Sequence, residues 1–117
     1  MAKKALRDRI LSVQDIQSEL VYVPEWDVEV EVRSMTGAQR ARVLKGATVD
    51  GEVDLERLYP ILLIETVYDP DSGEPVFEAA DRDALNAKNS GALERIAKVA
   101  MRLSGIDAGA EERAGNA

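Results

Sequence analysis

The feature that most constrains the fold is a run of alternating apolar and charged residues over 26–33, WDVEVEVR. Successive side chains of a β-strand point to opposite faces, so this run predicts a strand with one buried and one wet face. The preceding segment 20–23 is β-branched and aromatic, and Pro24 presets the φ angle of a turn. We expect two antiparallel strands joined by a loop of about three to five residues, because this segment has no Asn-Gly or Asp-Gly pair. The buried face is expected to carry Trp26, Val28, Val30 and Val32.

The periodicity then changes from that of a strand to that of helices. Thr36 and Gln39 form a capping-box pattern, which predicts the start of a helix over roughly 37–45. Gly46 is expected to end this helix, because glycine is common just past a helix C-terminus. An Asp-Gly pair at 50–51 predicts a turn. Further helices are predicted over 3–13, 81–88 and 91–103, with Asp81 capping the second and Asn89-Ser90 opening the third.

The segment 54–68 has two interpretations. Asp54 is a suitable cap for a helix, and apolar residues lie on most sides of it. Pro60 opposes this reading, since a proline inside a helix removes one hydrogen bond and costs about 3 kcal/mol. A buried strand over 61–68 is the competing interpretation, because periodicity does not separate the two in so short an apolar run. We favour the helix, and the strand stays open.

These elements predict an α+β fold: a small antiparallel β-hairpin near the N-terminus followed by a mostly α-helical domain of four to five helices. Residues 1–106 are expected to form this single domain. Residues 107–117 consist of Gly, Ala and charged residues with one Asn, and are expected to be a disordered C-terminal tail.

Composition excludes several function classes. The chain of 117 residues has no Cys, no His and a formal net charge of −7. These absences remove thiol nucleophiles, disulfides, the usual zinc sites and the commonest general base. The negative charge opposes general binding to nucleic acid, and no apolar run reaches the roughly 20 residues of a membrane helix. We therefore expect no catalytic residue, no cofactor or metal site, and neither nucleic acid nor membrane as a partner.

Two clusters of charged residues have ordinary structural interpretations. Asp69, Asp71 and Glu74 are close enough in sequence to hold a cation, but the twelfth position counted from Asp69 is Ala80, where a calcium loop needs an acidic ligand. A solvated turn over 69–75 is the better interpretation. The basic cluster near the N-terminus has no aromatic partner, so we interpret it as a solvated helix face rather than a nucleic-acid contact. Its members are Lys3, Lys4, Arg7 and Arg9.

Two aromatic residues are candidates for recognition. Tryptophan is enriched at interface hot spots, although it is also mostly buried in protein cores. The alignment of Trp26 with the valines of its strand favours the core role. Tyr22 fits a core and a recognition role equally well. We name Tyr22 and Trp26 as the candidate partner-binding residues.

Three motifs, taken in order, carry a resemblance to a known family. They are VYVPEWDVEVEVRSMTG at 21–37, LLIETVYDPDSGEPVF at 62–77 and ALERIAKVAMRLSGI at 92–106. Together they resemble the tail assembly chaperones of long-tailed bacteriophages, which are encoded beside the tail tube and tape measure proteins. The resemblance covers roughly residues 6–106. One departure is Asp27, since the family pattern has a glycine soon after the tryptophan.

The resemblance implies a non-enzymatic protein that binds the tape measure protein and keeps it soluble while tail tube subunits polymerise around it. It also implies the tail tube protein and a frameshifted longer form of the same chain as partners. The expected location is the host bacterial cytoplasm, with absence from the mature virion. Two alternatives are a structural tail component such as a completion protein, and an acidic inhibitor that mimics DNA. The 22 acidic residues are interleaved with 15 basic ones, which disfavours the DNA mimic.

Overall fold

The structure is a computed structural model that describes residues 2–106, and the predicted tail 107–117 lies outside the described residues. The predicted α+β class is confirmed: an antiparallel strand pair near the N-terminus precedes most of the helices. In chain order the elements are α1 (Ala2–Ser12), β1 (Ser18–Val23), β2 (Val28–Arg33), α2 (Gly37–Ala47), β3 (Thr48–Val49), β4 (Glu52–Val53), α3 (Leu55–Thr66), β5 (Val67–Tyr68), the 3-10 turn η1 (Ala79–Asp81), α4 (Arg82–Asn86) and α5 (Ser90–Leu103).

The β1–β2 hairpin forms, but its predicted buried face is only partly right. Val28 is 43% exposed because it lies at the turn end of β2, and Trp26 lies in the turn rather than in the strand. Val30 faces Val21 across the pair, and both are buried beneath α5, as are Val23 and Val32. The loop is four residues long and ends at Asp27, whose φ of 49° is left-handed. Glycine adopts that conformation most readily, and here Asp27 adopts it directly after Trp26.

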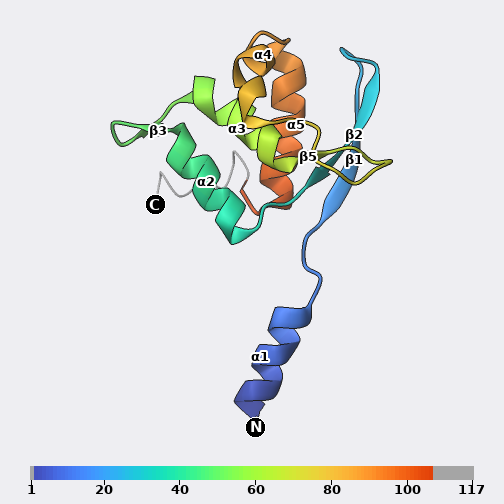
Figure 1. The fold of residues 1–117 in the computed structure, drawn as a ribbon, viewed down its shortest axis with the longest axis vertical. Coiled ribbons are helices and arrows are strands. Elements are labelled where there is room, and N and C mark those ends of the chain that lie inside the picture. Colours follow the sequence, from blue (N-terminus) through green and yellow to red (C-terminus); the bar gives the residue numbers. More distant parts are fainter. Residues whose placement is uncertain (1, 107–117) are drawn as a thin grey trace.

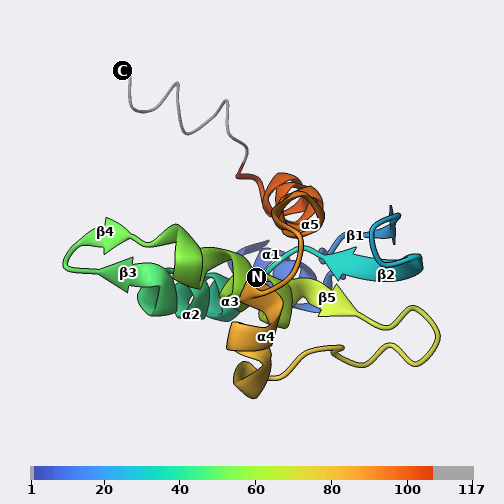
Figure 2. The same ribbon diagram turned by 90° about the horizontal axis from the view of Figure 1, so that it is seen from above.

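The body of the molecule is built around α3 and α5. Figure 1 shows α5 lying beside the hairpin, with α2 and α3 next to it and α4 at one end. Seen from above, the strands lie at one side of the helices and the β3–β4 turn at the other (Figure 2). Ile96, Leu62 and Leu63 are almost completely buried at the centre. Helix α1 stands away from this body on an extended segment (Figure 1).

Helix α3 contains Pro60, and a side chain from α4 replaces the hydrogen bond that the proline removes. A proline at this position cannot donate to the carbonyl of Glu56, four residues earlier. The side-chain amide of Asn86 on α4 donates to that carbonyl instead, at 2.7 Å. The helix reading of 54–68 is therefore confirmed up to Thr66. The last two residues turn into β5, which pairs with β2 through Val67 opposite Val32 and adds a third strand.

The predicted caps are mostly confirmed. Thr36 and Gln39 exchange capping-box hydrogen bonds of 3.1 and 2.9 Å at the start of α2. The prediction that Gly46 ends α2 is wrong, because the helix continues to Ala47. A Cβ at Gly46 would lie 2.8 Å from the Cδ1 of Ile61, so this glycine permits α2 and α3 to approach closely.

One further cap differs from the prediction. Asn89 caps α5 through its Oδ1, which accepts from the backbone of Gly91 at 2.9 Å, as expected. Asp81 stands at the N-cap position of α4, as predicted, but its side chain makes no capping hydrogen bond to that helix. It belongs to η1, and its carboxylate accepts from the backbone of Glu78 at 2.8 Å.

Candidate partner-binding surface

An apolar groove opens on the body between α2, α3 and the end of α5. Its volume is about 520 Å³. The β3–β4 turn closes one end, because β3 leads directly out of α2 and β4 directly into α3. A groove of this size between helices is a common form of binding site. Its lining residues are Met35, Arg40, Val43, Leu44, Val53, Leu55, Leu58, Leu62, Met101, Gly105 and Ile106.

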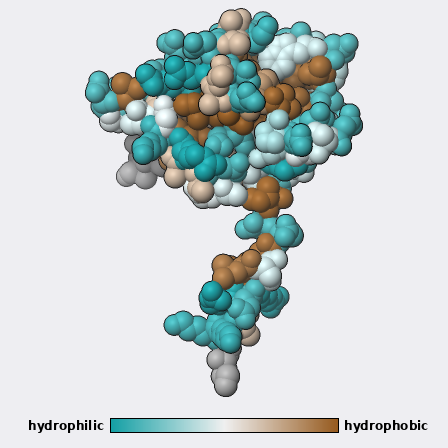
Figure 3. Space-filling model, viewed as in Figure 1, coloured by the Kyte–Doolittle hydropathy of each residue, from teal (hydrophilic) through white to brown (hydrophobic). Residues whose placement is uncertain are grey.

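Three of the lining side chains are unusually exposed for their chemistry. Leu44 is 47% exposed, Val53 is 52% exposed and Leu55 is 59% exposed. They border deeper residues such as Leu62, which is 1% exposed, so the apolar surface continues from the core to the rim. In the view of Figure 1, apolar side chains also gather at the centre of the body, with polar ones around them (Figure 3). Contiguous apolar surface of this kind marks a site of contact with another chain.

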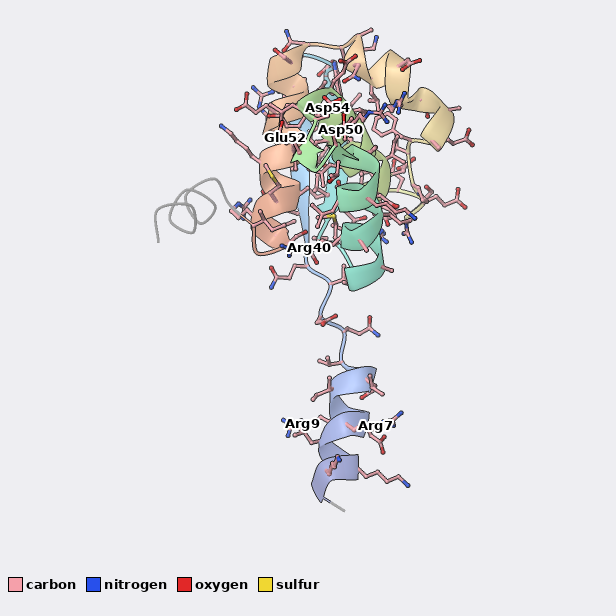
Figure 4. All side chains as sticks on the ribbon, turned by 90° about the vertical axis from the view of Figure 1, so that its left-hand side faces the viewer. Arg7, Arg9, Arg40, Asp50, Glu52 and Asp54 are labelled. Atoms are coloured by element: carbon pink, nitrogen blue, oxygen red, sulfur yellow. The ribbon has the colours of Figure 1, made fainter. Side chains whose placement is uncertain are left out.

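Charge is distributed unevenly around the groove. Asp50, Glu52 and Asp54 come from the β3–β4 turn and the cap of α3, and they lie together at one end (Figure 4). Asp54 is fixed by accepting from the backbone of Glu56 at 3.0 Å. Arg40 lies towards the opposite end, on the first half of α2 (Figure 4). Arg40 therefore lines the groove, whereas the three acids lie outside its lining, next in sequence to the lining residues Val53 and Leu55.

Tyr22 and Trp26, the residues proposed from sequence, lie on the β1–β2 hairpin and not in this groove. Tyr22 is 54% exposed, and its hydroxyl donates to Asp27 at 2.7 Å. This hydrogen bond to a carboxylate raises the pKa of Tyr22, because it favours the protonated phenol. Trp26 is half-buried against the core. Their role in partner binding remains a prediction.

Sequence reasoning missed the groove residues. Leu44 and Leu55 look like ordinary apolar positions of two amphipathic helices, and Val53 looks like a turn residue. Only their exposure after folding distinguishes them. The one signal in the sequence was the cluster of three acids at 50–54 beside apolar residues, which charge patterning alone does not separate from a solvated turn.

Neither a metal site nor a membrane-spanning segment is evident in the part of the chain that the structure describes. No group of three potential ligands there is arranged to hold a metal ion. Asp69 instead stabilises its own loop, where its carboxylate accepts from the backbone of Asp71 at 2.8 Å. No helix among residues 2–106 has the length and apolar character needed to cross a membrane.

Comparison with known proteins identifies the family. A sequence profile described as phage tail assembly chaperone matches residues 5–116. This chain belongs to the phage tail assembly chaperone family. The structure of the bacteriophage HK97 tail assembly chaperone superimposes with a TM-score of 0.65 at 22% sequence identity, covering 88% of this chain and 95% of that chain. That likeness shows a shared fold. No curated protein sequence matches significantly.

Proposed function

We propose that this phage tail assembly chaperone binds the tape measure protein and keeps it soluble while tail tube subunits polymerise around it. The role is non-enzymatic and belongs to the host cytoplasm. The observation that carries the proposal is the apolar groove, with Leu44, Val53 and Leu55 exposed at its rim. An amphipathic helix binds such a groove by inserting its apolar face, and a tape measure protein is a long chain rich in such helices.

The charge of the chain supports the solubilising role. The chain has a net charge of −7, so each bound copy adds negative charge to the complex, and like-charge repulsion opposes aggregation. A single groove gives modest affinity, because association must offset the lost freedom of both partners. Modest affinity suits a chaperone that is displaced as the tube grows. Further partners of the proposal are the tail tube protein and a frameshifted longer form of this chain.

Co-expression with the tape measure protein tests the proposal. We expect the tape measure protein to appear in the soluble fraction and to co-elute with the chaperone on size exclusion. The double variant Leu44→Ser/Leu55→Ser should leave it insoluble. Val76→Ser is the matched control, because Val76 is also exposed, at 43%, but lies outside the groove. The proposal would be overturned if the tape measure protein stayed insoluble when this chain and its frameshifted longer form were both supplied.

The hairpin candidates are tested in the same assay. Tyr22→Ala removes an exposed aromatic side chain without touching the groove. Lower yield of soluble tape measure protein would place part of the binding surface on the hairpin, whereas an unchanged yield would exclude Tyr22. Detection of the chaperone in purified virions would favour the alternative role of a structural tail component.

A further inference from the structure

The outer edge of strand β1 is unpaired in the described part of the chain. The sheet has the strand order β1-β2-β5, so β1 has a neighbouring strand on one side only (Figure 2). Lysine, proline and bulges commonly block such an edge in natural proteins. The six residues of β1, SELVYV, contain neither Lys nor Pro, and the register with β2 continues without a bulge from Ser18 to Val23. The edge of β1 is therefore open to a further strand.

The hydrogen-bond pattern shows which backbone groups point to this edge. The N–H of Ser34 donates to the carbonyl of Gln17 at 2.8 Å, and these two residues continue the register of β1 and β2. Opposed residues of an antiparallel pair alternate between hydrogen-bonded and non-hydrogen-bonded positions. Every second residue from Glu19 onward therefore bonds to β2, whereas the N–H and C=O groups of Leu20 and Tyr22 point away from it. An extended segment placed there can form backbone hydrogen bonds along β1.

The residues with outward backbone groups also expose their side chains. Leu20 is 58% exposed and Tyr22 is 54% exposed on the outer face of the sheet, whereas Val21 and Val23 are buried on the other face. Side chains that are neighbours across two strands stabilise a sheet by direct contact. A strand added to β1 therefore gains backbone hydrogen bonds and covers two apolar side chains.

The charge around this edge indicates the chemistry of the occupant. Asp27 and Glu29 lie at the turn end of the hairpin and form no ion pair within residues 2–106. Glu29 lies directly opposite Tyr22. The other acidic residues of the hairpin are already neutralised, in the pairs Glu19–Arg102, Glu25–Arg95 and Glu31–Arg33. The uncompensated charge is negative, so it favours a partner segment with a basic side chain at this end.

The same face of the sheet contains one complete arrangement of this kind. The guanidinium of Arg33 lies 3.9 Å from the ring centroid of Tyr68, and it donates to the carboxylate of Glu31 at 3.1 Å. Glu31 lies directly opposite Tyr68, as Glu29 lies opposite Tyr22. A cation over an aromatic ring is attracted by the ring face. Tyr22 has the ring and the opposed acid, but residues 2–106 place no cation over it.

We propose that the open edge of β1 receives an extended segment of the client tape measure protein, which adds as a further strand and places an Arg or Lys side chain over Tyr22, towards Glu29. The identity of the client rests on the proposed function, and the inference adds a second mode of binding to it. The groove takes a helix, whereas this edge takes a segment in extended conformation. A second copy does not supply the cation through its own β1, because that strand contains no basic residue.

Hydrogen exchange in the co-purified complex, read at single amides, tests the proposal. The outward amides of Leu20 and Tyr22 should exchange at least about tenfold more slowly in the complex than in the free chain, which corresponds to about 1.4 kcal/mol of local stabilisation. The amide of Val21 already bonds to β2 and is the internal control, because its exchange should change less.

The outcomes separate this inference from the proposed function. A complex that forms while both outward amides keep their free-chain exchange rates would overturn the inference and leave the proposed function standing. Protection that develops in the free chain as its concentration rises would assign the edge to a second copy, and would also overturn the inference. If no complex forms, the proposed function fails and the inference fails with it.

A backbone variant tests strand addition directly. Leu20→Pro removes the outward N–H without removing a hydrogen bond to β2, and proline is found in edge strands where the N–H faces solvent. The yield of soluble tape measure protein and the protection of the Tyr22 amide should both fall. Leu20→Thr is the matched control, because threonine keeps the N–H and suits a strand. Equal losses in the two variants would show that the leucine side chain, and not backbone pairing, is recognised.

A charge variant tests the basic side chain of the occupant. Glu29→Lys should lower the yield of soluble tape measure protein, because a lysine opposite Tyr22 repels the incoming cation. Asp71→Lys makes the same change in net charge at an exposed position of the 69–75 loop and should leave the yield unchanged. If both variants lowered the yield equally, the effect would be one of net charge, and no cation would bind at Tyr22.

Discussion

Substituting Asn86 with alanine should destabilise the fold through the proline in α3. The side chain of Asn86 supplies the hydrogen bond that Pro60 cannot give to the carbonyl of Glu56, at 2.7 Å. A single intramolecular hydrogen bond contributes about 0.5–1.5 kcal/mol to stability, so we expect Asn86→Ala to lower the free energy of unfolding by about 1 kcal/mol. In a domain of this size that corresponds to a fall in Tm of about 4–8 °C.

A double-mutant cycle tests the cause. In Pro60→Ala the new backbone N–H at position 60 can donate to the carbonyl of Glu56, so the amide of Asn86 is no longer needed there. Asn86→Ala should then cost little in the Pro60→Ala background, and the coupling free energy should be close to the cost of Asn86→Ala alone. The assay is urea unfolding followed by far-UV circular dichroism. Lys88→Ala, an exposed change nearby, is the control and should stay within about 0.5 kcal/mol of the wild type. If Asn86→Ala lowered the free energy of unfolding equally in both backgrounds, Asn86 would not be compensating for Pro60.

Three further predictions use the same unfolding assay. Thr36→Ala removes the side-chain acceptor of the α2 capping box and should cost about 1 kcal/mol; an unchanged stability would contradict the assigned cap. Ile96→Ala opens a cavity at a side chain that is 0% exposed and should cost about 2–5 kcal/mol, and a smaller loss would mean that this site collapses around the cavity. Arg95 hydrogen-bonds to Glu25 and lowers the pKa of that carboxyl below its ordinary value of 4.5. Because the folded-state pKa is the lower one, the ion pair stabilises the fold above the ordinary pKa and this contribution is lost as pH falls through the folded pKa. In a plot of the free energy of unfolding against pH, Arg95→Gln should therefore show a smaller fall at acid pH than the wild type. Identical slopes for variant and wild type would show that this pair does not contribute.

The groove is formed by residues that lie far apart in the sequence, so no short stretch of sequence reveals it. Its walls come from α2, α3 and the end of α5, and the absence of a side chain at Gly46 leaves room for Ile61 where the first two helices meet. Sequence reasoning directed attention to Tyr22 and Trp26 because aromatic residues are recognisable one at a time. A groove is recognisable only when residues distant in the chain are placed together, so aliphatic residues at its rim carried no distinctive signal.

The sequence by itself determined the elements whose stabilising interactions are local. Alternation over 26–33 predicts the hairpin, the Thr36–Gln39 pair predicts the start of α2, and the apolar period of α5 is visible in its own residues. Tertiary structure decided the rest. Pro60 is tolerated in α3 because a partner 30 residues from Glu56 in sequence reaches its carbonyl, and β5 forms because β2 lies beside it. In each case the deciding hydrogen bond joins segments that meet only after the chain has folded, which is why periodicity over a short window left helix and strand unresolved there.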